Sequence, residues 1–436
     1  MLLNTKKLSN GINLSTINSD KFKTGVLVAS LHLPLTEAGA AYSLLLSSLM
    51  GRGTKKYPTL AELNRSLDEL YGSYVELRSS HVCNEMSLTI SCEILDNRFI
   101  PDSTDVLGGV IDILSQLLLF PRFMENDFDE EIFNQEKKIA LDNLKAEKNN
   151  TRSYSIKRCA ELIREGLSSY PKHKRLMELV EGASLADIKE LYSRFRGDSF
   201  MDIFYIGATE QSVIEGKLLS SLADYKASVT SREILPVPYK RDSAAYVTEK
   251  MPVSQGKLAM GFSTGVCLSD SDDRYYVGYM LNEILGGSPA SKLFTNVRER
   301  MSLCYYCSSS FSIYNGTIMV SSGIEVSKVD TVKAAILSQL EDIKNGNISE
   351  YELNAARASI TNCYRQLYDN PFDLQSFYGA RALFGIKDSI EECLKKLMKV
   401  TASDISELAA QMSLDAVFFV EGTLSQDEAE EEMSDE

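Results

Sequence analysis

An arginine and a tyrosine in the second half of the chain, Arg298 and Tyr305, have side chains that could bind a peptide and stabilise charge on it. A guanidinium presents several fixed donors to carbonyl oxygens, and a phenol can donate to an oxyanion as charge develops. Ordinary structural roles also fit, because an arginine near a helix end can be a solvated cap and a strand tyrosine is usually half-buried packing. Tyr306 follows directly, so the register of the tyrosine stays open by one residue.

Two cysteines in the same segment, Cys304 and Cys307, form a CxxC pattern that could serve redox chemistry or metal binding. We expect a strand here, and side chains three apart on a strand point to opposite faces. This spacing favours packed thiols over a shared site.

A glutamate in the first half, Glu136, lies on one face of an expected helix with Ile132 and Ile139. A carboxylate on a partly apolar face often marks a site. The alternative is a glutamate at the edge of that face, hydrogen-bonded or reaching solvent.

The composition excludes some classes of protein. The chain of 436 residues has a net charge of −15, whereas a nucleic-acid-binding protein usually shows a basic patch. Its apolar runs are far shorter than a membrane span, and its first ten residues lack the apolar core of a signal peptide. Eight cysteines without framework spacing fit reduced thiols. We therefore expect a cytoplasmic protein that binds neither nucleic acid nor membrane.

The two halves of the chain resemble each other. A helix-like segment over residues 131–149 matches residues 351–369 in apolar pattern. An apolar helix that ends at glycine also occurs in both halves, at 42–51 and 276–287, and strand-like alternation follows each. Such internal similarity indicates a duplicated domain.

Each half reads as strand, helix, helix, strands, long helices and strand. This order predicts an α+β fold of two tandem homologous domains, each an antiparallel-rich sheet packed with helices. A polar stretch with Pro236 and Pro238 is the expected linker. The predicted parts are an N-terminal domain 1–225, a linker 226–245, a C-terminal domain 246–425 and an acidic, disordered tail 426–436.

The whole chain apart from this tail resembles the insulinase, pitrilysin and mitochondrial processing peptidase family. The segment LMGRGTKKYP, residues 49–58, is similar to the flank that follows the inverted zinc motif His-x-x-Glu-His in that family. The resemblance implies two tandem α+β domains arranged as a half clam-shell. In active members the two histidines and a distant glutamate bind zinc, and the motif glutamate is the general base for the metal-bound water.

The zinc motif itself is degenerate in this chain. Counting back from Gly53, its two histidine positions hold Leu44 and Ser48 and its base position holds Ser47. Zinc is held by imidazole, thiolate or carboxylate, so we expect no zinc and no catalysis by this chain alone. The resemblance makes Glu136 the remnant of the third ligand position.

The resemblance also assigns a role to the segment RERMSLCY, residues 298–305, which is similar to the family pattern Arg-Glu-x-x-Gly-Leu-x-Tyr. In the family, this Arg and Tyr face the zinc site and contact the substrate backbone and the developing oxyanion. Here they are Arg298 and Tyr305, while Ser302 replaces the glycine. Glu76 and Leu77 replace the Asn-Ala that commonly holds substrate in the first domain.

Loss of the zinc motif beside a kept Arg and Tyr predicts a non-catalytic, substrate-binding subunit of a heterodimeric zinc metallopeptidase. A homologous bacterial chain with an intact His-x-x-Glu-His would bring the zinc, and Arg298 and Tyr305 would complete its active chamber around a peptide. The alternative is an inactive peptide-binding scaffold or chaperone-like structural protein without a proteolytic partner. A homodimer in isolation is also compatible with the sequence.

Overall fold

The computed structural model describes residues 3–166, 169–226, 228–229, 234, 236, 238–268 and 272–424. The predicted acidic tail 426–436 lies outside these residues, as does part of the predicted linker. The chain divides into two compact units.

The sheet of the first unit has the strand order β1-β2-β6-β3-β5-β4. Strands β2 and β6 pair in parallel, and the other neighbours are antiparallel. The strands are β1 Leu3–Lys7, β2 Asn13–Asn18, β3 Thr24–Pro34, β4 Tyr74–Val82, β5 Glu85–Leu95 and β6 Phe200–Gly207.

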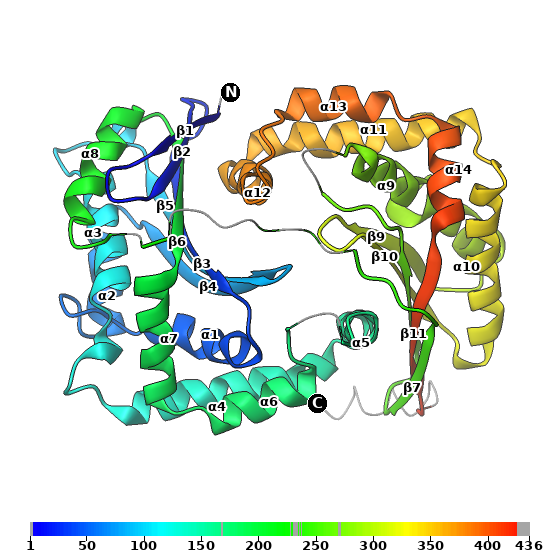
Figure 1. The fold of residues 1–436 in the computed structure, drawn as a ribbon, viewed down its shortest axis with the longest axis horizontal. Helices are drawn as coiled ribbons and strands as arrows, with labels where there is room; N and C mark the ends of the chain where they lie inside the picture. Colours follow the sequence, from blue (N-terminus) through cyan, green and yellow to red (C-terminus); the bar gives the residue numbers. More distant parts are fainter. Residues whose placement is uncertain are drawn as a thin grey trace. The chain divides into compact units, whose positions relative to one another are not determined.

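Helices cover this first sheet, and α1, α3, α7 and α8 contact its strands directly (Figure 1). The helices of the unit are α1 Glu37–Met50, α2 Leu60–Glu69, α3 Val106–Leu119, α4 Glu130–Ala146, α6 His173–Gly182, α7 Leu185–Asp198, α8 Gln211–Ser221 and α12 Pro371–Ala382, with short 3₁₀ turns at Asn97–Phe99, Arg122–Met124 and Leu367–Asp369.

The sheet of the second unit has the order β7-β11-β8-β10-β9, again with one parallel pair, β7 with β11. Its elements are α5 Thr151–Ile163, β7 Ala245–Met251, β8 Gly256–Ser263, α9 Arg274–Asn282, β9 Tyr306–Ser312, β10 Thr317–Ile324, α10 Val329–Lys344, α11 Glu350–Gln366, α13 Ile390–Met398, α14 Ala402–Gln411 and β11 Ser413–Gly422. The unit also contains 3₁₀ turns at Glu147–Asn149 and Val326–Lys328, and π-helical turns at Glu283–Gly287 and Leu293–Arg300. The α+β fold class and the antiparallel-rich sheets predicted from the sequence are confirmed.

The units are not continuous in sequence, in contrast to the two contiguous domains expected. The first unit comprises residues 1–145, 169–234 and 367–383, and the second comprises the rest. Helix α5 therefore belongs with the second sheet although it comes from the first half of the chain, and α12 belongs with the first sheet although it comes from the second half.

Helix α12 packs on the face of the first sheet that points away from the main core. Along β6, Ile203 and Tyr205 join the large apolar cluster of the unit. The side chain of Phe204 alternates to the other face, where its ring lies 3.8 Å from the position that a Cβ on Gly379 of α12 would take. The turn between β2 and β3 helps to hold this segment, because Lys21 Nζ donates to Tyr368 O and contacts Asp369 Oδ1, both at 2.7 Å.

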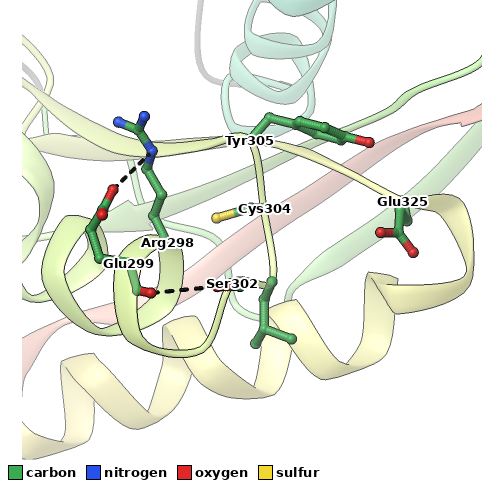
Figure 2. A pocket seen from close by; sticks show the side chains of 7 residues that line it. Arg298, Glu299, Ser302, Cys304, Tyr305 and Glu325 are labelled. Carbon is green, nitrogen blue, oxygen red and sulfur yellow. Dashed lines mark hydrogen bonds and ion pairs between the residues drawn. The ribbon is translucent and has the colours of Figure 1, made fainter.

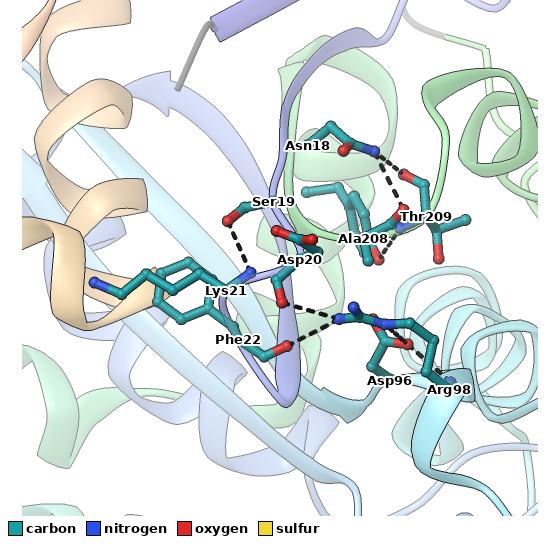
Figure 3. A network of polar contacts seen from close by, with 10 residues as sticks. Asn18, Ser19, Asp20, Lys21, Phe22, Asp96, Arg98, Ala208 and Thr209 are labelled. Atoms are coloured by element: carbon teal, nitrogen blue, oxygen red, sulfur yellow. Dashed lines mark hydrogen bonds and ion pairs between the residues drawn. The ribbon is translucent and has the colours of Figure 1, made fainter.

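That turn is itself fixed by a polar network (Figure 3). Arg98 Nη2 donates to the carbonyl oxygens of Asp20 and Phe22, and Arg98 Nε donates to Asp96 Oδ1 at 3.0 Å. The Asn18 amide donates to the carbonyl of Ala208 at 3.2 Å. These bonds tie the turn to neighbouring loops of the same unit.

Helix α5 packs on β8 and β11 in the second unit. Cys159 and Ile163 belong to a buried cluster with Ala259 and Phe418, and Cys159 Sγ donates to Ala416 O at 3.6 Å. The approach is close at Gly261, where a Cβ would collide with Ile163 Cδ1 and lie 3.5 Å from Cys159 Sγ.

This close approach predicts that Gly261→Ala lowers the free energy of unfolding by about 1–3 kcal/mol, because an added methyl group overpacks the contact between α5 and β8. Ile163→Val alone should cost about 1 kcal/mol. The double variant should lose less than the sum of the two, because the shorter side chain makes room for the methyl group. Urea denaturation measures all three, and strictly additive losses would contradict the contact.

Candidate functional site

The face of α1 that carries the degenerate zinc motif holds no titratable group at the three motif positions. Ser47 Oγ and Ser48 Oγ both donate to the carbonyl oxygen of Leu44, at 3.0 and 3.2 Å. The Leu44 side chain packs against the apolar cluster of the first unit. Both hydroxyl protons are thus bound within the helix.

The possible remnant ligand, Glu136 on α4, is almost fully buried and hydrogen-bonded. Its side chain is 6% exposed and pairs with Arg52, whose side chain is 34% exposed. Arg52 Nε donates to Glu136 Oε1 at 2.5 Å, and Nη2 donates to the same oxygen. A guanidinium therefore supplies the positive charge that this buried carboxylate needs.

Arg52 is held by a tight turn at the end of α1. Gly53 has φ 148°, and a Cβ there would lie 2.8 Å from the carbonyl oxygens of both Tyr57 and Pro58. Glycine is required at such a position. Arg52 belongs to none of the motifs recognised in the sequence, although a basic residue close to a motif without metal ligands was a usable signal.

Within the part of the chain that the structure describes, no group of three or more His, Cys, Asp or Glu side chains is arranged to hold a metal ion. Among the same residues, no helix combines the length and the apolar character needed to cross a membrane.

The ion pair predicts that Arg52→Ala lowers the free energy of unfolding by about 3 kcal/mol, because it leaves a buried carboxylate without its partner. Arg52→Met combined with Glu136→Gln should recover most of this loss, since no buried charge remains. Thermal and urea denaturation compare the variants. An unchanged midpoint for Arg52→Ala would show that the pair does not stabilise the fold.

In the second unit, Arg298 and Tyr305 line one hollow of ≈ 350 Å³ (Figure 2). Its remaining lining residues are Glu299, Ser302, Leu303, Cys304 and Glu325. A neighbouring hollow of ≈ 750 Å³ shares Tyr305 and Glu325 and extends along Ser254, Gln255 and the end of β11. The structure thus brings together the two residues that the sequence singled out.

Arg298 lies in the last turn of the π-helical segment Leu293–Arg300. Its guanidinium stacks on the Phe294 ring at 4.6 Å, and its Nε lies 3.5 Å from Glu299 Oε1. The stacking holds one face of the guanidinium while leaving N–H groups at its edge available to a ligand.

Ser302 turns the chain from this helix toward the strand. It has φ 50°, a left-handed conformation that glycine adopts without steric cost. The resemblance places a glycine at this position, and the backbone keeps the conformation that a glycine favours. Ser302 Oγ donates to Glu299 O at 3.4 Å (Figure 2).

The surroundings of Tyr305 and Tyr306 show which of the two tyrosines could contact a ligand. Tyr305 is 52% exposed and lines the hollow. Tyr306 begins β9, where its ring occupies the space beside Gly323 and lies under the guanidinium of Arg152 at 4.2 Å. Tyr305 is therefore the residue available to a ligand, and Tyr306 is packing.

This difference predicts that two neighbouring substitutions lower the free energy of unfolding by different amounts. Tyr306→Ala should lower the free energy of unfolding by about 2 kcal/mol, because it removes a packed ring. Tyr305→Ala should change it by no more than about 0.5 kcal/mol, since its ring is largely in solvent. Denaturation midpoints test the pair, and a larger loss at Tyr305 would reverse the assignment.

The expectation that one strand carries both Cys304 and Cys307 is wrong. Strand β9 begins at Tyr306, and Cys304 lies before it, next to a bend at Tyr305. Cys304 lines the hollow, whereas Cys307 lies on β9 and is buried.

In the first unit, β4 is an edge strand. Glu76, at the position where the family resemblance implies a substrate contact, pairs with Arg78 Nε at 2.7 Å. Its carboxylate is therefore engaged along its own strand.

The fold and site define a two-unit α+β protein in which the positions that correspond to a zinc motif carry no zinc ligands. Residues 182–360 match the family model of the peptidase M16 inactive domain. A relative from Bacillus subtilis (strain 168), named as a probable inactive metalloprotease YmfF, is 27% identical over 96% of this chain and 97% of its own. A second, named as an uncharacterized zinc protease YmxG, is 22% identical over 69% of this chain and 72% of its own.

Solved structures show the same fold. A conserved protein from Enterococcus faecalis V583 has a TM-score of 0.85 and 26% identity, covering 97% of this chain and 99% of its own. A protein from Pseudomonas fluorescens, described as a peptidase M16 inactive domain, has a TM-score of 0.76 and 14% identity, covering 98% and 100%. The chain is thus similar over residues 182–360 to the M16 inactive domain, and over nearly its whole length to a relative named as probably inactive.

Proposed function

We propose that this chain is a non-catalytic, substrate-binding subunit of a heterodimeric M16 peptidase. In this proposal, a homologous chain with an intact His-x-x-Glu-His brings the zinc, and Arg298 and Tyr305 contact the peptide that the partner cleaves. Two observations support it most: the motif positions carry no zinc-ligand residues, and Arg298 and Tyr305 line one hollow.

The first unit argues against hydrolysis by this chain alone. The motif positions carry a leucine and two serines whose hydroxyl protons bond within the helix. The carboxylate of Glu136 is neutralised by Arg52. A zinc ion would need that carboxylate and two more ligands, so hydrolysis requires a metal from another chain.

The second unit supports a role in binding a peptide. A guanidinium and a phenol hydroxyl are the donors that bind peptide carbonyls and stabilise an oxyanion. Glu299 and Glu325 line the same hollow, and their charges disfavour a ligand carboxylate while leaving a neutral backbone carbonyl acceptable. The hollow suits the interior of a peptide chain better than its C-terminus.

The shape of the surface supports an extended ligand. The hollow around Arg298 and the larger one beside it share Tyr305 and Glu325. Strand β9 is an edge strand of its sheet, so its outer backbone groups are those that an added strand would pair with. Peptide substrates of several residues fit this arrangement.

The proposal predicts that adding this chain to a motif-bearing M16 chain from the same genome raises zinc-dependent peptide cleavage. Tyr305→Phe and Arg298→Ala should each lower kcat of the mixture, by roughly 100-fold for the loss of an oxyanion donor. A fluorogenic peptide assay, with and without zinc chelation, measures this.

Matched controls come from the same unit. Tyr351 is 73% exposed on α11 and lies outside both hollows. Tyr351→Phe should therefore leave the mixture fully active, as should Arg365→Ala on the same helix. Unchanged partner activity on adding the wild-type chain would overturn the proposal. Peptide binding without that change would favour the inactive scaffold instead.

A further inference from the structure

The second unit carries a pair of cations that the proposed function does not use. Arg152 is the second residue of α5, and Lys257 lies on β8. The guanidinium carbon of Arg152 lies 4.2 Å from the centre of the Tyr306 ring, and Lys257 Nζ lies 5.8 Å from the same centre. One aromatic ring of β9 thus brings the two positive charges into one neighbourhood.

The register of the second sheet explains this proximity. Gly323 of β10 pairs with Lys257 on one side and with Tyr306 on the other. Paired residues project to the same face of a sheet. This is the face that α5 covers, because Ala259, two residues along β8, belongs to the same buried cluster as Ile163. Since Gly323 has no side chain, the Tyr306 ring occupies the space above it.

The two cations have neutral partners. Arg152 Nη2 donates to the Ser308 hydroxyl at 3.2 Å, and Lys257 Nζ donates to Gln255 Oε1. Within the described part of the chain, neither forms an ion pair with a carboxylate. Lys157 on the same helix, in contrast, has an acidic partner at 2.6 Å. In a chain with 61 acidic and 46 basic residues, the need for charge balance within the fold does not explain this pair.

The pair costs the unliganded protein electrostatic energy. Burial lowers the pKa of Lys257, and the positive charge of Arg152 lowers it further. An anion bound beside both groups would remove this repulsion. A guanidinium binds a carboxylate through parallel N–H···O bonds, and an ammonium has three donors, of which Gln255 uses one. The pair is therefore suited to a carboxylate.

The cation pair adjoins the surface that we assign to the peptide. Gln255, which accepts from Lys257, lines the larger hollow together with Tyr305. A strand rises about 3.3 Å per residue, so Ser308, which bonds to Arg152, lies about 10 Å along the chain from Tyr305. A peptide that follows the edge of β9 past Tyr305 would bring a residue about three positions away to Arg152.

We propose that Arg152 and Lys257 form a subsite for a carboxylate of the peptide ligand, about three residues from the backbone group that meets Tyr305. The subsite rests on the proposed function and names its substrate class: peptides with an acidic side chain, or a C-terminal carboxylate, at that distance. The two surfaces are complementary. Glu299 and Glu325 disfavour a carboxylate in the first hollow, whereas the cation pair attracts one.

Peptide binding to the full chain alone tests the subsite without a partner subunit. The probes are fluorescein-labelled, C-terminally amidated decapeptides of alanine, leucine and serine that differ only in one central residue, glutamate or glutamine. Fluorescence anisotropy at fixed ionic strength should give a Kd about tenfold lower for the glutamate peptide, as expected for one hydrogen-bonded charge contact. A third peptide, with glutamine and a free C-terminal carboxylate, shows whether a terminal carboxylate binds as well. Equal affinity for all three peptides would overturn the subsite.

Three variants locate the preference. Lys257→Met and Arg152→Met each remove one charge and keep an unbranched side chain. Each should abolish most of the preference for the glutamate peptide and leave the affinity for the glutamine peptide unchanged. Lys157→Met removes a charge that already has an acidic partner, so this control should keep the preference. A preference that persists in both subsite variants, or that falls equally in the control, would reflect general charge attraction and overturn the proposal.

Lysine acetylation gives a second measurement on the wild-type chain. N-Hydroxysuccinimide acetate modifies accessible amines, and peptide mapping follows Lys257 and Lys157 separately. Acetyl-Glu-amide should slow the modification of Lys257 in a saturable way and leave Lys157 unchanged, whereas acetyl-Gln-amide should slow neither. Failure of every peptide to bind would contradict the proposed function. Absence of protection at Lys257 would overturn the subsite.

Discussion

The central strands of each sheet are buried on both faces, and this constraint determines how the chain is distributed. Strand β3 is buried at eight of its eleven positions and β8 at seven of its eight. A strand with two buried faces needs apolar cover on each. One layer comes from helices of the same half of the sequence, and the second face receives α12 in the first unit and α5 in the second. Each unit is thereby completed by a helix from the other half of the chain.

The sequence predicted the fold class because its signals are local or repeated. Alternation along β5, glycine at the end of α1 and the similarity between residues 131–149 and 351–369 all lie within single elements or recur between the halves. The packing of α5 and α12, each on the sheet formed mainly by the other half of the chain, has no such signal. The apolar face of α5 shows that the helix packs on a partner, but Cys159 and Ile163 would suit either sheet. Which sheet they meet depends on tertiary packing, which periodicity does not encode.

The candidate site residues also differ in whether the sequence could predict them. Arg298 and Tyr305 could be proposed from a motif whose spacing fixes their neighbourhood. Arg52 could not, because its role arises from a contact between α4 and the turn after α1, far apart in sequence. Arg52 provides the positive charge that a metal ion would otherwise provide to Glu136. A buried carboxylate requires a cation, and where no metal ligand set exists a guanidinium meets the same electrostatic demand with two hydrogen bonds to one oxygen. The first unit can thus keep Glu136 buried without binding zinc.

The two units differ in what their corresponding regions retain. In the first, every polar group at the degenerate motif is bound by a neighbour within the fold. In the second, Arg298 and Tyr305 line an open hollow, with the guanidinium over the Phe294 ring and the tyrosine half exposed. Exposed polar side chains of this kind contribute little to stability. The difference between the two regions therefore supports the proposed ligand-binding role of the second unit.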